Sequence, residues 1–196
     1  FFCGPYAGRD REIREHVRGL LINPNNEAAL NYVAVRTLGR FTQAREWDET
    51  REYEEALRDW QSRFQTVQGQ ITFQQLRTVM DCYFLPYRDG EEANRLLNDL
   101  RDNPARAKET LTSIKEFCGL VTGLKDRPLF YALSRRIWDL REEADLMERY
   151  LIWKESGAGG VFRSDAHLPE TFRGGFLRKL QSLLNPRTDG AFESRL

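Results

Sequence analysis

The sequence predicts an all-α protein built as a multi-helix bundle of seven to eight helices, with a short α-solenoid as the alternative. Three observations support this fold class. Apolar residues recur at i, i+3 and i+4, which places them on one face of a helix. Capping residues, prolines and glycines separate these stretches from one another. No stretch shows the alternation of apolar and polar residues that is typical of a half-buried strand.

Three helices are expected in the first third of the chain. The first spans about residues 10–22 and ends before Pro24, because proline disfavours helical geometry in the residue that precedes it. The second follows an asparagine cap and covers about residues 25–38, where Gly39 supplies a C-terminal break. The third is long, with tryptophan and leucine on its inner face, and covers about residues 42–67.

Four further helices carry clear start signals. Thr72 and Gln75 are spaced as a capping box, in which each side chain satisfies a backbone N–H group near the other. Asp89 gives the next helix an acidic cap. The Asn-Pro pair at 103–104 puts a cap and a first-turn proline in the favoured order. Asp126 caps the seventh helix, which has the most regular apolar stripe in the chain.

A change in composition marks one candidate boundary between domains. The stretch at 157–160 reads Gly-Ala-Gly-Gly and is the strongest linker candidate. A last amphipathic helix is expected beyond it, over about residues 169–184. The sequence therefore predicts a helical body over residues 1–156 and a glycine-hinged C-terminal helical appendage over residues 157–196.

Charge and composition argue against several protein classes. The chain has 30 basic and 30 acidic residues, so no global field draws it to nucleic acid or to an anionic membrane. No run approaches the ~18 apolar residues of a membrane span, so we expect a soluble protein. Three widely spaced cysteines give neither a disulfide framework nor a zinc site. The sequence starts with Phe1 and not methionine, so we expect that an upstream segment was removed, and the compartment stays open.

Two histidines leave few options for catalysis. His16 follows Glu12 by one helical turn, and such a pair commonly forms an ion pair on a helix surface. His167 lies between Asp165 and Glu170 in a glycine-flanked loop, and these side chains are workable ligands for a divalent metal. A competent site needs further ligands, and no second cluster supplies them. We therefore predict no catalytic residue, no metal and no cofactor, and keep an enzyme with a loop site near His167 as one alternative.

Basic and aromatic residues gather near the C-terminus of the chain. On the last predicted helix, basic side chains lie on one face and phenylalanines on the opposite face. Such a helix can contact RNA or phosphate, or it can dock its apolar face in the groove of a partner. The candidate contact residues are Arg163, Arg173, Arg178, Lys179, Arg187, Phe172 and Phe176.

The preferred interpretation is a non-catalytic helical subunit that assembles with other protein subunits or with further copies of itself. Its support is the absence of a recognisable catalytic set and the surplus of aromatic residues, because tryptophan is enriched at interface hot spots. One alternative is a coat or nucleocapsid-type protein that binds nucleic acid through the arginine-rich C-terminal segment. The other alternative is the enzyme with a loop site near His167.

Overall fold

A computed structural model describes residues 2–157 together with Phe162 and Leu183. Within these residues it contains seven α-helices and one 3-10 helix, and its β-type pairing is limited to isolated bridges. The prediction of an all-α multi-helix bundle is confirmed. The elements are α1 (Ile13–His16), η1 (Ala28–Leu30), α2 (Tyr32–Gln43), α3 (Glu49–Gln61), α4 (Phe73–Cys82), α5 (Glu91–Asp102), α6 (Pro104–Val121) and α7 (Arg127–Glu155).

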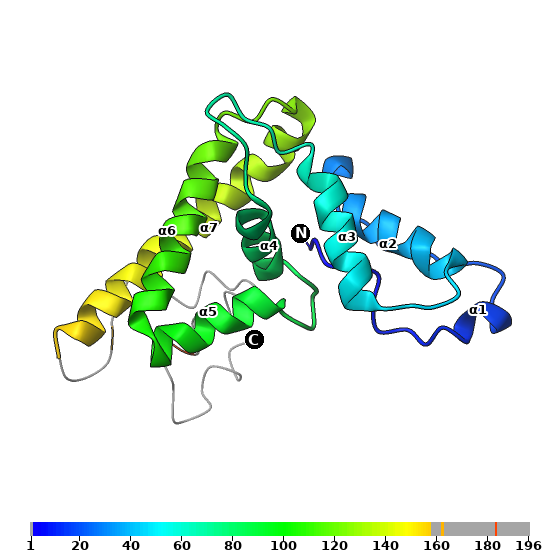
Figure 1. Cartoon of the computed structure of the whole chain (residues 1–196), viewed down its shortest axis with the longest axis horizontal. Coiled ribbons are helices and arrows are strands. Elements are labelled where there is room, and N and C mark those ends of the chain that lie inside the picture. The colour runs from blue at the N-terminus through cyan, green and yellow to red at the C-terminus, as the bar shows by residue number, and fades with distance from the viewer. Residues whose placement is uncertain (1, 158–161, 163–182, 184–196) are drawn as a thin grey trace.

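The helices form two arms that meet at an apex, with α4 between them (Figure 1). One arm contains α2 and α3, and the other contains the antiparallel pair α6 and α7, with α5 crossing below α4. The loop before α4 meets the loop before α7 at the apex. There the N–H of Val67 donates to the carbonyl of Gly123 at 2.9 Å, and Arg63 pairs with Asp126 at 2.6 Å. The two arms are therefore joined by backbone as well as side-chain contacts.

One hydrophobic cluster runs through both arms. It includes buried residues from every long helix, and its largest fully buried side chains include Trp60, Tyr53, Phe64 and Phe117. Trp60 and Phe64 meet edge to face, with their ring centroids 5.0 Å apart. Because the buried residues form one cluster, the helices share a single core.

The first residues of the chain belong to this core. The side chain of Cys3 is buried, and its N–H donates to the carbonyl of Tyr83 at 2.6 Å. The N–H of Gly4 donates to the carbonyl of Phe84 at 2.7 Å, and a Cβ atom at position 4 would overlap that carbonyl oxygen. The chain can therefore lie against the end of α4 only with a glycine at this position.

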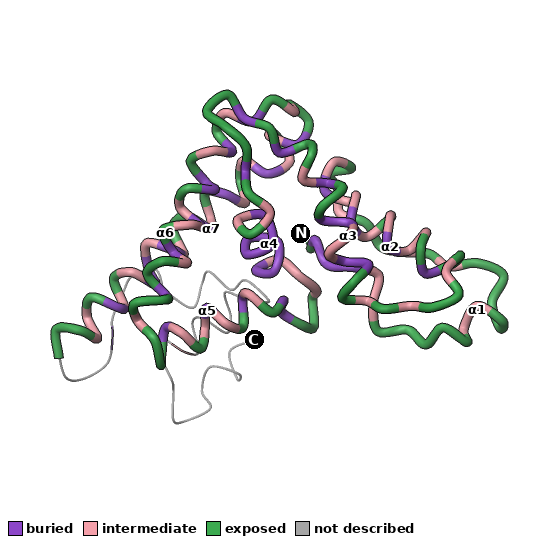
Figure 2. The backbone as a smooth tube through the Cα atoms, in the orientation of Figure 1, coloured by how far each residue is buried: buried purple, intermediate pink, exposed green. Residues whose placement is uncertain are grey.

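The first three predicted helices differ from the observed ones. The expected helix over 10–22 is wrong apart from α1. None of the elements that the structure describes covers its apolar face: Figure 2 shows this segment largely exposed, and Leu21 is 98% exposed. The expected C-terminal break at Gly39 is also wrong: this residue lies inside α2, which starts after its N-cap Asn31 and ends at Gln43. The long third helix is shorter than expected, because Asp48 caps it and it ends at Gln61.

The start signals of three later helices are confirmed. Thr72 and Gln75 form both hydrogen bonds of the capping box before α4. The side chains of Asn103 and Asp126 cap α6 and α7, each accepting a backbone N–H from the first turn. The acidic cap expected at Asp89 is wrong, because the N-cap of α5 is a glycine without a capping side chain.

Two further expectations concern the ends and the surroundings of the chain. Most of the appendage predicted over residues 157–196 lies outside the described residues, so its division from the body over 1–156 stays a prediction. None of the helices that the structure describes is long and apolar enough to cross a membrane.

Candidate functional site

The contact residues predicted near the C-terminus lie outside the described residues, as does the loop with Asp165, His167 and Glu170. The described residues therefore do not test whether these contact residues bind nucleic acid, other protein subunits or further copies of the chain. His16 is exposed on α1. Among the residues that the structure describes, no group of acidic, histidine or cysteine side chains could hold a metal ion. The contact residues concerned are Arg163, Arg173, Arg178, Lys179, Arg187, Phe172 and Phe176.

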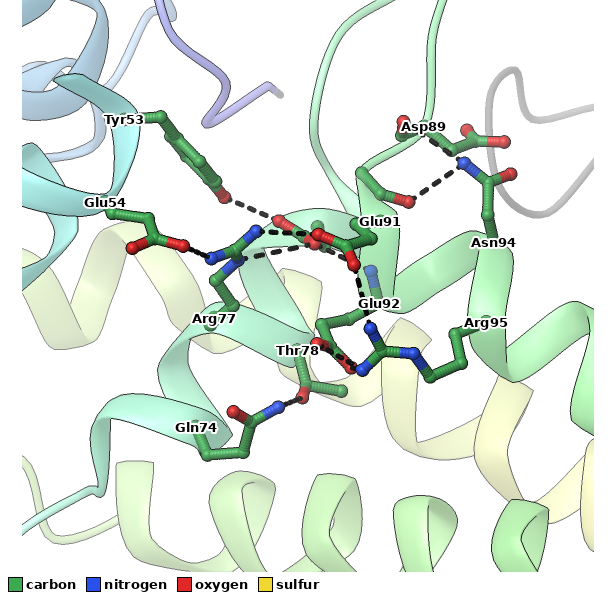
Figure 3. Close-up of polar contacts among 12 residues, drawn as sticks. Tyr53, Glu54, Gln74, Arg77, Thr78, Asp89, Glu91, Glu92, Asn94 and Arg95 are labelled. Atoms are coloured by element: carbon green, nitrogen blue, oxygen red, sulfur yellow. Dashed lines mark hydrogen bonds and ion pairs between the residues drawn. The ribbon is translucent and has the colours of Figure 1, made fainter. Parts of the chain in front are cut away.

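The strongest site among the described residues lies where α3, α4 and the start of α5 meet (Figure 3). Two charged residues of α4, Arg77 and Asp81, are one turn apart, and both are buried in a helix whose other buried residues are mostly apolar. Burying a charge is costly unless partners satisfy it. The neighbouring helices supply those partners.

Asp81 accepts hydrogen bonds from two other helices. Its Oδ1 accepts from the hydroxyl of Tyr53 on α3 at 2.8 Å, and its Oδ2 accepts from the backbone N–H of Glu92 in the first turn of α5 at 2.8 Å. The N–H of Gly90 donates to the backbone carbonyl of Asp81 at 3.1 Å. Asp81 thus acts from α4 as the capping carboxylate that α5 lacks in its own sequence.

Arg77 occupies the centre of an ion-pair network. Figure 3 shows its guanidinium group between Glu54 of α3 and Glu91 of α5. Nη2 of Arg77 lies 3.3 Å from Oε2 of Glu91, and Nε of Arg77 lies 3.8 Å from Oδ2 of Asp81. Glu91 also pairs with Arg95 on its own helix at 2.8 Å. The network therefore joins three helices through one guanidinium group.

Burial changes the acidity of the two hydrogen-bonded partners at the centre of the site. Burial raises the pKa of the Asp81 carboxyl. The Glu92 N–H, the Tyr53 hydroxyl and the Arg77 charge lower this pKa by less, so the net pKa is raised. Burial also raises the pKa of the Tyr53 phenol well above its usual value, and the Asp81 charge adds to this effect. Tyr53 is therefore a neutral donor at every ordinary pH.

A pocket of about 290 Å³ opens beside this network. Its walls combine carboxylates, guanidinium groups, an amide and aromatic rings, and its floor includes Asp81. Ligand pockets commonly have this combination of apolar surface with a few placed polar groups. The lining residues are Glu49, Thr50, Tyr53, Arg77, Asp81, Phe84, Arg88, Asp89, Gly90, Glu91 and Asn94.

A second ionic cluster joins α2 to α3. The buried carboxylate of Glu52 lies 3.1 Å from Arg40, 3.7 Å from Arg36 and 3.6 Å from Arg51. Burial raises the pKa of Glu52, but the hydrogen bonds and charges of Arg40 and Arg51 outweigh it, so the net pKa is lowered. A second pocket, of about 380 Å³, lies beside this cluster and is lined by Ala28, Ala29, Asn31, Tyr32, Val35, Arg36 and Arg63.

None of the residues that line the pocket between α3, α4 and α5 was a predicted site residue, and Asp89 was expected only as a helix cap. One signal was present, because Arg77 and Asp81 interrupt the apolar face of a helix whose neighbouring positions Leu76, Met80 and Cys82 are buried. Charged residues at such positions require partners from other elements. The identity of those partners depends on tertiary packing and is not visible in the sequence.

Comparison with known proteins gives a functional direction. A model of the β-N-acetylglucosaminidase family matches residues 1–81, which include α1, η1, α2, α3 and most of α4. Proteins named protein O-GlcNAcase from Rattus norvegicus and Mus musculus are each 23% identical over 141 aligned residues. These alignments cover 58% of this chain and 15% of each relative, so the chain spans a small part of their length.

These similarities correct the main functional interpretation. The preferred hypothesis of a non-catalytic assembly subunit is contradicted, because the family that matches and the curated relatives are glycoside-cleaving enzymes by name. The comparisons favour the alternative of an enzyme. The family match covers α3 and most of α4, which supply five of the eleven residues that line the pocket.

Proposed function

We propose that this chain forms part of a β-N-acetylglucosaminidase, an enzyme that hydrolyses the bond between N-acetylglucosamine and the oxygen of its substrate. The observation that carries the proposal is the match of residues 1–81 to that family. The name of the relatives adds O-linked N-acetylglucosamine on proteins as the proposed substrate class. The modified protein would then be the partner of the enzyme.

Hydrolysis of a glycosidic bond breaks the link between the anomeric carbon and the leaving oxygen. Water supplies the hydroxyl group on that carbon, and an acidic group supplies a proton to the leaving oxygen. A carboxyl group suits this acid role when it is free of a basic partner and its pKa is raised. In the pocket, Glu49 pairs with Arg88, and Glu91 pairs with Arg77 and Arg95. We therefore assign these paired carboxylates to binding and orientation, and not to proton transfer.

Asp81 has a raised pKa but a different geometry. Its side chain is fully buried, and both of its oxygens accept hydrogen bonds. A carboxyl group held in this way fixes the positions of Tyr53 and of the first turn of α5. Its role in the proposal is to hold the walls of the pocket in place.

The proposal is tested with the full-length protein that contains this chain. The assay measures release of nitrophenol from para-nitrophenyl N-acetyl-β-glucosaminide, with the α-anomer and the β-glucoside as controls. The expected result is release in proportion to the amount of protein from the β-linked N-acetyl substrate, and a much slower reaction with both controls. A pure, folded, full-length protein that releases no nitrophenol from any of the three would contradict the proposal.

A further inference from the structure

The helix α5 is held at both of its ends by side chains of other helices. Its N-cap is Gly90, which has no side chain, and the side chain of its C-cap Asn103 accepts from the N–H of Arg106 and so caps α6. The ends of a helix leave backbone N–H and C=O groups without partners inside the helix, and these groups need partners from elsewhere. In α5, side chains of α4 and α7 supply them.

At the N-terminal end, the contacts come from α4. The carboxylate of Asp81 accepts from the N–H of Glu92 at 2.8 Å, and the N–H of Gly90 donates to the backbone carbonyl of Asp81 at 3.1 Å. The carboxylate of Glu91 lies 3.3 Å from the guanidinium group of Arg77, as Figure 3 shows. These contacts of Asp81 and Arg77 with the first turn of α5 are called the N-terminal latch below.

At the C-terminal end, the contact comes from α7. Nζ of Lys154 donates to the carbonyl of Leu100 at 3.2 Å and also to the carbonyl of Arg101. A cation at this end of a helix satisfies carbonyl groups that lack an intrahelical donor, and it interacts favourably with the helix dipole. This contact of Lys154 is called the C-terminal latch below.

Between the two latches, α5 contributes few side chains to the core. Of its 12 residues, only Ala93, Leu96 and Leu100 are buried, whereas seven of the ten residues of α4 are buried. Local opening costs least free energy where few buried apolar contacts are lost. A helix of this length is also marginal in water on its own, so it cannot persist once its contacts are broken. These properties make α5 a unit that opens before the rest of the core.

We propose that α5 is a gate of the pocket, held closed by the two latches and opening as one unit when either latch is released. Gly90, Glu91 and Asn94 form the wall that α5 contributes to the pocket, so opening widens its entrance. Opening also exposes Asp81 and Arg77 to solvent, and water solvates these buried charges. The proposal rests on the contacts of α5 and is independent of the enzymatic activity proposed above.

The test is hydrogen–deuterium exchange of the full-length protein, measured on overlapping peptides. In wild-type protein, we expect the amides of α5 to exchange about 10-fold faster or more than the buried amides of α6 and α7. Lys154→Met releases the C-terminal latch and should accelerate exchange at both ends of α5 by the same factor, at least ~10-fold. Glu91→Gln weakens the N-terminal latch and should accelerate the same amides by about 2–5-fold.

Lys108→Met is the matched control for Lys154→Met. Lys108 pairs with Glu155 at the same end of α7, but this contact joins α7 to α6 and not to α5. The control should therefore leave the exchange of α5 unchanged. Both lysines are partly or fully exposed, so neither change disturbs the core.

Three outcomes would overturn the proposal. The first is that the amides of α5 in wild-type protein exchange as slowly as those of α6 and α7, since α5 would then open only with the whole molecule. The second is that Lys154→Met accelerates exchange only in the last turn of α5, which would be fraying of one end and not the opening of a unit. The third is that Lys108→Met accelerates exchange in α5 as much as Lys154→Met does.

Discussion

Replacing Asp81 by alanine is expected to destabilise the protein by about 3–5 kcal/mol, the range for removing one partner of a buried charge network. The change leaves the hydroxyl of Tyr53 and the N–H of Glu92 without an acceptor, and each such buried donor costs about 1–3 kcal/mol. It also removes the nearest anion to the Nε of Arg77. Asp81→Asn keeps the shape and one acceptor oxygen, so we expect a smaller loss of about 1–3 kcal/mol.

The assay is urea denaturation followed by far-ultraviolet circular dichroism, with Tyr53→Phe as the second arm of a double-mutant cycle. In wild-type protein, Tyr53→Phe removes a hydrogen bond to Asp81 and should cost about 1 kcal/mol. In Asp81→Ala protein it removes a hydroxyl that already lacks its acceptor, so its cost should vanish. The reasoning is refuted if the two single changes add without coupling, or if Asp81→Ala is as stable as wild type.

Three other predictions concern pH, glycine and thiols. The pKa of Asp81 is raised in the folded state. The stability that this shift adds is therefore complete below the pKa of an unfolded aspartate, about 3.9, and is lost as pH rises through the folded pKa. Asp81→Asn should remove this loss of stability from denaturation curves recorded at a series of pH values. Glu52 has a lowered pKa, so its contribution is present above about pH 4.3 and is lost as pH falls through the folded value; Glu52→Gln should remove that loss instead. Gly90→Ala should destabilise the protein by more than ~1 kcal/mol, because the added Cβ would lie 2.6 Å from Cα of Asp81. A Cβ at Gly119 on α6 has no described atom within 4 Å, so Gly119→Ala should stabilise the protein by about 0.5–1 kcal/mol. Thermal melting of both variants measures these changes. All three thiols are buried, and burial raises their pKa values, so Ellman's reagent should label them only after unfolding; labelling of native protein would be evidence against this packing.

Local signals in the sequence were sufficient for the starts of α4, α6 and α7. Thr72 with Gln75, the Asn-Pro pair at 103–104 and Asp126 act through hydrogen bonds to residues within the same turn, so their effect does not depend on distant contacts. The expected helix over 10–22 failed for the opposite reason. An apolar stripe stabilises a helix only when another element covers it, and the exposure of Leu21 shows that none of the described elements does.

The candidate site depends on such distant contacts. Asp81 caps a helix other than its own, and Tyr53 reaches it from 28 positions earlier in the chain. The sequence can show that a buried charge needs partners, but it cannot show which helices come close enough to supply them. Net charge and local motifs do not mark the pocket for a related reason: it is built from ordinary charged residues at spacings that match no local motif.

The pairing of Cys3 and Gly4 with Tyr83 and Phe84 has a consequence for the order of folding. These amides find their acceptors only by closing a loop of about 80 residues, and the entropic cost of such closure is about 4 kcal/mol. During synthesis on the ribosome, Cys3 and Gly4 therefore wait for the end of α4 before they can be ordered. Cys3 and Gly4 therefore take up their native position only after α4 has been made.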